Sequence, residues 1–297
     1  MRGAAGRLIL LFFVILAPTA GCSNKAQPGA APSASAMASQ RPAATPLPAK
    51  VQPPTPPGCR AMKVSGSVAL EGGGPLVSGA LVDGSAWLEL PDKSEVWLKH
   101  PPSGRELNVF GPARVLACRA GREELLLASG KVTTSTGAGV RPGAEVLIAT
   151  PEAALRYGNA ELVAISRDGK LALEVRAGET WVEAADPAAK LKTNPVRPKG
   201  RLSLRGKLGA EALLERCHVL AEAAAESARQ VLSRTADSGS PGERAATQVR
   251  DRRSARAACS IAAAATGLVA DPGERQRLRG LLERWDQVWQ AVPRAPK

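Results

Sequence analysis

The middle of the chain alternates between apolar and polar residues in short runs. Residues 85–90 and 95–99 are two such runs, and the turn-forming residues 91–94 separate them. Similar runs follow up to residue 183, with Gly, Pro, Asn or Asp in nearly every gap. This alternation with frequent turn residues is typical of antiparallel β-structure. We therefore expect residues 59–186 to fold as a mainly β domain, an antiparallel sandwich or roll.

The pattern changes to a helical period after the β-region. Apolar residues recur at three- and four-residue spacing in three segments, residues 213–232, 249–268 and 278–289. Turn residues at 237–241 predict the end of the first helix, and Pro241 suits the first position of the second. Asp271 and Pro272 predict the start of the third. Short connections between three helices indicate a small antiparallel bundle, which we assign to residues 208–292.

The five tryptophans are candidate core residues. Trp87, Trp97 and Trp181 lie in the β-region, and we expect them inside it because aromatic side chains dominate such interiors. Trp285 and Trp289 are four residues apart and share one helix face. They form either an exposed stripe for a partner or part of the bundle core, and the core is the simpler interpretation.

The N-terminus has the pattern of a secretory signal peptide. Arg2 and Arg7 precede an apolar run at residues 8–16, which is too short to span a membrane, and small residues follow up to residue 21. Thr-Ala-Gly before Cys22 resembles the lipobox of bacterial lipoproteins, in which the cysteine receives a lipid anchor. The alternative is ordinary cleavage near Gly21 with an unmodified Cys22.

A lipidated cysteine would place the protein in the bacterial cell envelope. Residues 1–21 would be the signal peptide, and residues 22–58 the lipid anchor with a linker rich in Pro and Ala. Such a segment cannot bury enough surface to offset the entropy of ordering. Ser23 follows the anchor cysteine where an aspartate would resemble an inner-membrane retention signal. We therefore favour the outer membrane.

The chain is strongly basic, with a formal net charge of +13. In an exported protein, this favours anionic partners such as cell-wall polymer, lipopolysaccharide or phospholipid headgroups. A genome-wide preference for arginine is the alternative explanation. Aromatic residues make up only 3% of the chain, so stacking platforms for single-stranded nucleic acid are not expected.

Residues 187–207 are predicted to be a basic linker. Pro195 and Pro198 interrupt regular structure, and a short β-stretch over residues 201–205 is left open. The basic residues of this segment are the candidates for binding an anionic partner: Lys190, Lys192, Arg197, Lys199, Arg201, Arg205 and Lys207. Simple solvation of a flexible connector would explain them equally well.

Four cysteines remain after Cys22 is set aside, and they allow three disulfide connectivities. Cys59 and Cys118 fall in the β-region, whereas Cys217 and Cys259 fall in the helical region. Pairing within each region is the simplest choice, and antiparallel packing of the first two helices would bring Cys217 and Cys259 together. No C-x-x-C spacing is present, so we predict disulfides rather than a metal site.

The sequence offers little for catalysis. His100 and His218 are the only histidines. His100 precedes two prolines and is expected in a surface loop, and no G-x-S-x-G motif is present. We predict no catalytic residue and no cofactor.

Four segments of the β-region resemble the FecR domain, the periplasmic module of iron-transport signalling regulators. They are residues 84–96, with a strand, turn and strand; residues 125–132, with strand, Gly, Lys and Val; residues 148–159, with Thr-Pro and a later Gly; and residues 173–182, which repeat the strand–Gly–strand unit. The resemblance covers residues 78–183. It implies a β fold and a noncatalytic role in binding or sensing another protein.

These observations favour two functions. The first is a noncatalytic envelope lipoprotein whose FecR-like domain binds an envelope protein in a sensing or scaffolding role. The second is an envelope tether whose basic linker and helices bind anionic cell-wall polymer or lipopolysaccharide. Salt dependence of binding would distinguish the two, because salt screens exposed charges. A hydrolase that uses His100 is a third, weaker hypothesis.

Overall fold

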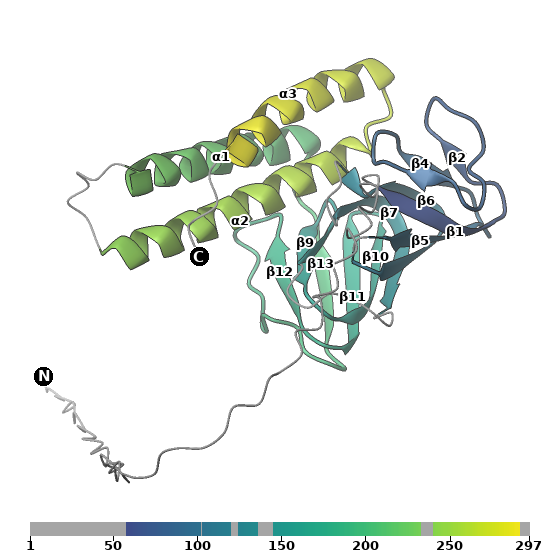
Figure 1. The fold of residues 1–297 in the computed structure, drawn as a ribbon, viewed down its shortest axis with the longest axis horizontal. Coiled ribbons are helices and arrows are strands. Elements are labelled where there is room, and N and C mark those ends of the chain that lie inside the picture. The colour runs from purple at the N-terminus through teal and green to yellow at the C-terminus, as the bar shows by residue number, and fades with distance from the viewer. Residues whose placement is uncertain (1–57, 102, 120–123, 136–144, 233–239, 292–297) are drawn as a thin grey trace, which may run out of the picture. The chain divides into compact units, whose positions relative to one another are not determined.

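The computed structural model describes residues 58–101, 103–119, 124–135, 145–232 and 240–291. These residues belong to one compact unit. Thirteen strands come first and three helices follow (Figure 1). The prediction of a mainly β region followed by C-terminal helices is therefore confirmed. The signal peptide, Cys22 and the Pro/Ala-rich linker up to residue 57 lie outside the described residues.

The elements agree closely with the periodicity of the sequence. The strands are β1 (Cys59–Ser65), β2 (Ala69–Leu70), β3 (Leu81–Val82), β4 (Leu88–Leu90), β5 (Glu95–His100), β6 (Arg105–Ala117), β7 (Glu124–Ser135), β8 (Val146–Ala149), β9 (Ala153–Tyr157), β10 (Glu161–Arg167), β11 (Lys170–Ala177), β12 (Thr180–Ala184) and β13 (Arg201–Arg205). The helices are α1 (Ala210–Leu232), α2 (Pro241–Thr266) and α3 (Pro272–Ala291). Among these strands, only β7 and β8 pair in parallel.

The connected sheet folds over itself at its two longest strands. The first half of β6 pairs with β5 and its second half with β4, and the register shifts between Phe110 and Arg114. The first half of β7 pairs with β8 and its second half, from Gly130, with β10. Gly130 has a φ of +115° and lies directly against Ala113, where a Cβ would not fit. A glycine is therefore required where β7 bends between the two layers.

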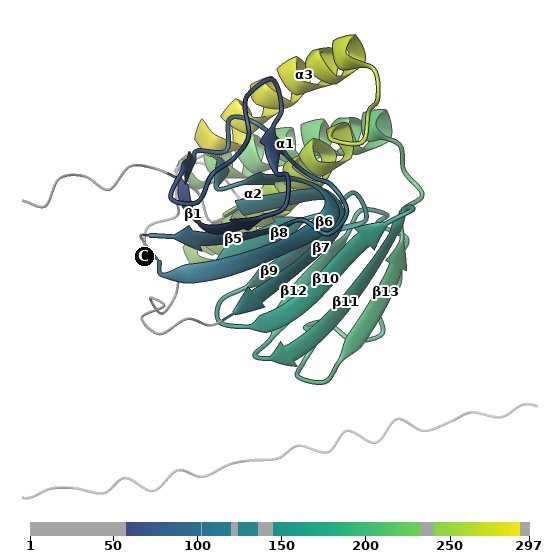
Figure 2. The ribbon, with the colours of Figure 1, turned by 90° about the vertical axis from the view of Figure 1, so that its right-hand side faces the viewer.

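Two layers result from this bend. The helix-covered layer contains β12, β9, β8, the first half of β7, the second half of β6, β4 and β2. The open layer contains β13, β11, β10, the second half of β7, the first half of β6, β5, β1 and β3 (Figure 2). The inward residues of both layers form the first hydrophobic core; Leu98, Val109, Val132, Ile148, Leu155, Leu171 and Leu173 are among them.

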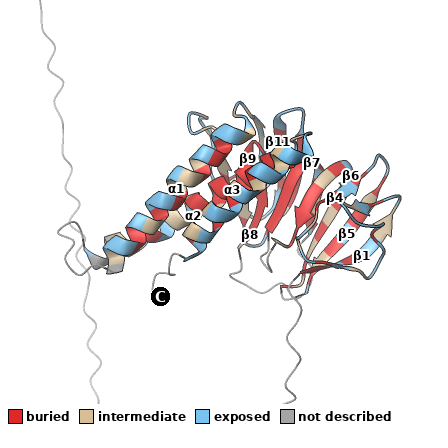
Figure 3. Cartoon of the chain, turned by 90° about the horizontal axis from the view of Figure 1, so that it is seen from above, coloured by how far each residue is buried: buried red, intermediate tan, exposed pale blue. Residues whose placement is uncertain are grey.

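The helices cover the outer face of the helix-covered layer. Contacts join α2 to β7, β8 and β9. Residues 255–265 of α2 are almost all buried, and most are alanines. Small side chains let the helix axis come close to the sheet, so a second core forms between them from Leu126, Leu147, Ile261 and Leu282, among others. Figure 3 shows the buried positions as stripes along the helices and beneath them on β7.

Both predicted disulfides are present. Cys59 is bonded to Cys118, and Cys217 is bonded to Cys259. The first joins the start of β1 to the residue after β6. The second joins the first half of α1 to the second half of α2, as expected for antiparallel neighbours.

The placement of three residues corrects the sequence analysis. On β5, Val96 and Leu98 point into the first hydrophobic core. Trp97 lies between them, so it faces outward and is 39% exposed. His100 shares the inward parity and is buried at 7% exposure, not in a surface loop. Trp181 on β12 is also outward-facing, at 48% exposure. Trp87 and Trp289 are buried as expected, but Trp87 belongs to the core beneath the helices.

Residues 187–207, for which the sequence predicts a linker, follow the sheet closely. Asn194 bonds to the backbone N–H and C=O of Val182 at 3.0 and 2.9 Å. Val196 is buried and exchanges backbone hydrogen bonds with Thr180. Residues 201–205 form β13, which pairs with β11. The alternation of Leu202 and Leu204 with polar residues explains why this short stretch joins the core.

Candidate binding surface

No described element covers the outer face of the open layer. The pairing registers align its outward residues in rows across the strands, because paired residues lie on the same side of a sheet. One row contains Lys63, Trp97, Asn108, Thr133, Val163, Glu174 and Arg201. The next row contains Glu95, Phe110, Lys131, Ile165, Ala172 and Ser203. We call this surface the open face.

Apolar side chains are exposed in the middle of the open face. Trp97 is 39% exposed and Ile165 36% exposed, and Phe110 is half-buried. The Lys131 ammonium lies over the Phe110 ring, 4.9 Å from its centroid. This cation–π contact holds a positive charge beside the apolar centre.

Basic side chains border the apolar centre. Arg205, Lys170 and Arg167 form a third row at one end of the face. All three are exposed, and none has an ion-pair partner among the described residues. Acidic neighbours neutralise only part of the remaining charge: Glu174 lies 3.7 Å from Arg201, and Glu106 lies 3.3 Å from Lys99. The open face therefore has more basic than acidic side chains.

The seven basic residues that the sequence singles out lie in different parts of the structure. All seven are exposed. Arg201 and Arg205 lie on the open face. Lys190, Lys192, Arg197 and Lys199 lie on the connection between β12 and β13, where Arg197 is 3.5 Å from Glu179, and Lys207 follows β13. They are not one cluster, and strand pairing groups Arg201 and Arg205 with residues of β10 and β11 that the sequence did not single out.

Strand alternation could show that the other basic and apolar residues of the open face share one side of their own strands, but not that they form one surface. Lys131, Ile165 and Lys170 occupy outward positions on three different strands. Their alignment depends on the order of the strands in the sheet, which periodicity does not specify. A surface spread over several strands is therefore visible only in the folded molecule.

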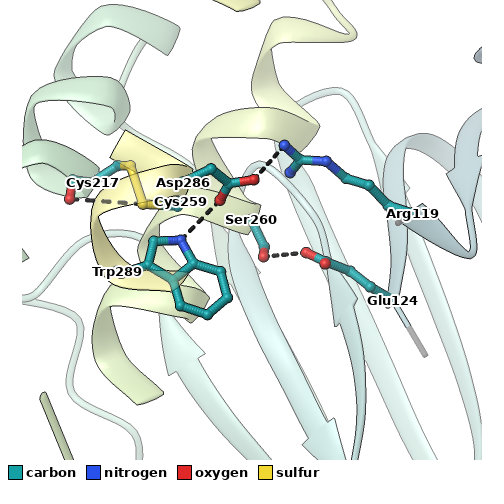
Figure 4. Close-up of a disulfide and its surroundings, with 7 residues drawn as sticks. All are labelled: Arg119, Glu124, Cys217, Cys259, Ser260, Asp286 and Trp289. Carbon is teal, nitrogen blue, oxygen red and sulfur yellow. Dashed lines mark hydrogen bonds and ion pairs between the residues drawn. A yellow bond between two sulfur atoms is a disulfide. The ribbon is translucent and has the colours of Figure 1, made fainter. Parts of the chain in front are cut away.

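The junction between helices and sheet is a second group of polar residues (Figure 4). Arg119 pairs with Asp286, which also accepts a hydrogen bond from the Trp289 indole at 2.8 Å. The buried Ser260 on α2 donates to Glu124 at the start of β7. In each contact, two side chains of this group bind each other at the interface between the helices and the sheet. This group holds the helices to the sheet.

Glu71 forms a third group, between the β2–β4 segment and α3. Its carboxylate accepts hydrogen bonds from Arg114 at 2.6 Å, from Arg279 at 2.7 Å and from Arg275. Burial alone would raise the pKa of Glu71, but the Arg279 and Arg114 guanidinium groups together hold it below its ordinary value. A cleft of about 510 Å³ lies beside this cluster. Its charged groups pair with one another, so the cluster links the β-region to α3.

A fourth candidate is a groove of about 490 Å³ between α2 and β9, lined by Arg156, Val249, Arg250, Arg253 and Ser254, among others. Two of its three guanidinium groups lie near acids, Arg156 at 3.6 Å from Glu145 and Arg250 at 3.4 Å from Asp251. Burial raises the pKa of the nearby Glu183. The groove has less uncompensated positive charge than the open face.

The two histidines lie in different elements, His100 on β5 and His218 on α1. His100 Nδ1 lies 2.9 Å from the Ser103 hydroxyl, inside the fold. His218 stacks on Trp285 with ring centroids 3.7 Å apart and lies 3.0 Å from Glu222. Trp285 is thus half-buried against α1 rather than an open stripe. Within the described residues, no group of three or more potential ligands could hold a metal ion.

No helix in the described part of the chain is long and apolar enough to cross a membrane. No protein-family model matches this chain, and no curated protein gives a significant match. The likeness to the FecR domain stays a prediction from the four β-segments.

Proposed function

We propose that this protein is a noncatalytic binding protein of the bacterial cell envelope, anchored through Cys22, whose open face binds another envelope protein in a sensing or scaffolding role. The observation that supports this function is the pair Trp97 and Ile165, exposed in the middle of a rigid sheet and bordered by lysines and arginines. The resemblance of residues 78–183 to the FecR domain favours the same role.

The composition of the open face suits a protein partner. Interfaces between proteins have an apolar, aromatic centre and a polar rim, and tryptophan and arginine often contribute most of the binding energy. The centre here contains Trp97, Phe110 and Ile165, and the rim contains Arg201 and Arg205. The strands hold these side chains in place before binding, which lowers the entropic cost of association. The basic rim selects a partner with an acidic surface.

The second candidate function is a tether to an anionic polymer. The exposed row of Arg167, Lys170 and Arg205, which has no ion-pair partner in the described part of the chain, favours this alternative together with the net charge of +13. A polymer would be held mainly by charge, so its binding would fall steeply with salt. A protein partner that covers Trp97 would keep an apolar contribution that salt does not screen.

Capture from solubilised envelope at low and high salt tests the proposal. The wild-type chain is compared with Trp97→Ala on the open face and with Trp181→Ala, which removes an exposed tryptophan from the other layer. We expect one protein to be retained at high salt, with about tenfold weaker capture by Trp97→Ala and no loss for Trp181→Ala. Equal capture by the two variants, or capture of polymer that disappears at high salt, would refute a protein-binding open face.

The proposed anchor has its own test. Cys22→Ser removes the sulfur that would carry the lipid, so the variant should leave the membrane fraction after cell fractionation. A variant that stays with the membrane would show that Cys22 does not anchor the chain.

A further inference from the structure

The outermost strands of the two layers differ in whether other residues cover their free edges. At one end, Asn194 and Val196 occupy the free edge of β12. β2 and β3, at two other ends, have two residues each. β13 has five residues, and no further strand pairs with it among the described residues (Figure 2). An uncovered strand edge presents N–H and C=O groups that can pair with another chain.

The hydrogen bonds of β13 show which of its groups are available. Val175 N–H donates to Gly200 at 3.0 Å, and Gly206 N–H donates to Gly169 at 2.8 Å. Hydrogen-bonded pairs alternate along an antiparallel ladder, so Leu202 and Leu204 between these points also bond to β11. The backbone groups of the alternate residues, Arg201, Ser203 and Arg205, therefore point away from the sheet.

The side chains of β13 give this edge a distinct chemical pattern. Arg201 and Arg205 are exposed at its two ends with Ser203 between them, all on the open-face side. Leu202 and Leu204 lie on the other side, half-buried against the first core. A strand added to this edge would need acidic residues opposite the two arginines and apolar residues beside the two leucines.

The same pattern disfavours a second copy of this chain. If two β13 strands paired in antiparallel fashion around Ser203, Arg201 of one copy would face Arg205 of the other. Like charges directly opposite each other destabilise a strand pair. The occupant that fits is therefore a different, acidic chain.

We infer that β13 is a strand-addition site for an extended segment of the partner, with acidic residues four positions apart and apolar residues between them. This inference rests on the proposed function and names the way in which the partner protein is held. The added strand would extend the open layer and place the rest of the partner against Trp97 and Ile165. Backbone pairing would supply affinity, and the two arginines would set the register.

The test uses the full chain in detergent and a dye-labelled, acetylated peptide Glu-Val-Thr-Val-Glu, with Lys-Val-Thr-Val-Lys as its charge-reversed control. Binding is followed by fluorescence polarisation, and the backbone amides of β13 by NMR. We expect the acidic peptide to bind and to shift the amides of Arg201, Ser203 and Arg205 more than those of Leu202 and Leu204. The basic peptide should bind at least about tenfold more weakly.

Ser203→Pro and Ser203→Ala form a matched pair for the backbone contact. Proline removes the outward N–H without touching the bonds to β11, whereas alanine keeps that N–H. The proline variant should bind the acidic peptide about tenfold more weakly, and the alanine variant should bind as wild type does. The double variant Arg201→Glu and Arg205→Glu keeps the backbone intact and should prefer the basic peptide.

Strand addition at β13 would be overturned by equal binding of the two Ser203 variants, by no preference between the two peptides, or by dimerisation of the chain through this edge. If the arginines serve only to protect the edge, neither peptide will bind, which also refutes the inference. Partner capture distinguishes failure of strand addition from failure of the proposed function. Loss of partner capture in Trp97→Ala with unchanged capture in Ser203→Pro would keep the open face as the binding surface and reject strand addition.

Discussion

Glu71 forms ion pairs with three arginines. Its carboxylate meets Arg114 from β6 together with Arg275 and Arg279 from α3. Without it, three guanidinium groups would face one another in a partly buried site. Removing one member of such a group is costly because the remaining charges lose their partner.

Glu71→Gln should lower the free energy of unfolding at neutral pH by about 1–3 kcal/mol. The pKa of Glu71 is lowered in the folded state, so its stabilisation is complete above the ordinary value of 4.5 and is lost as the pH falls through the folded-state value. Urea unfolding at pH 7 and at low pH measures the difference between wild type and variant. The difference should shrink towards zero in acid.

Glu89→Gln is the matched control, because Glu89 contacts only Arg114 in this group and is half exposed. Its effect should stay below about 1 kcal/mol at either pH. A penalty for Glu71→Gln that is the same at both pH values would show that the carboxylate charge is not what stabilises the cluster.

Alternation predicts which strand residues share a side, but not which side is the core. Trp97 is the largest residue of its strand, yet Val96 and Leu98 set the inward parity and leave it outside. His100 is drawn inside by the same parity, although the prolines that follow suggest a loop. The sequence singles out Arg201 and Arg205 of β13 as basic candidates, but it does not indicate that Arg167 of β10 and Lys170 of β11 lie in one row with Arg205.

At the scale of elements, the packing of α2 on the sheet depends on small side chains. Ala262, Ala264 and the neighbouring alanines are fully or almost fully buried between the helix and the strands. At the end of α2, Gly267 has helical backbone angles, but a Cβ there would lie 2.6 Å from the Trp87 ring and 2.7 Å from Ala128. Close contact, not backbone conformation, therefore requires glycine at this position.

Gly267→Ala should destabilise the protein by about 1–3 kcal/mol through overpacking, even though alanine is the better helix former. Gly280 in α3 is the control, since nothing lies within 4 Å of a Cβ there. Gly280→Ala should stabilise by about 0.5–1 kcal/mol. Urea unfolding of both variants measures these effects. If Gly267→Ala is as stable as Gly280→Ala, the contact with Trp87 does not limit the helix position.

At the scale of the whole molecule, helices and sheet share one interface. The second core combines residues of β7, β8 and β9 with residues of all three helices. The sequence predicted both regions and their disulfides because periodicity and spacing are local signals. It did not predict that α2 would cover one layer, or that β6 and β7 would each serve two layers. These features arise from pairing between distant segments.

Removal of the helical disulfide tests this shared interface. Cys217→Ser with Cys259→Ser should lower the free energy of unfolding by about 2–4 kcal/mol, because the bond closes a loop between residues 42 apart. Tryptophan fluorescence and far-UV circular dichroism should still report one coincident transition. A separate, earlier loss of helix would show that the helices are stable independently of the sheet.

The most direct test of the central claim is hydroxyl-radical footprinting of the chain with and without its captured partner. Trp97 and Ile165 report on the open face, and Trp181 reports on an exposed site of the other layer. We predict that the partner lowers the oxidation of Trp97 and Ile165 several-fold and leaves that of Trp181 unchanged. Protection of Trp181 with unchanged oxidation of Trp97 and Ile165 would contradict the assignment of the open face as the binding surface.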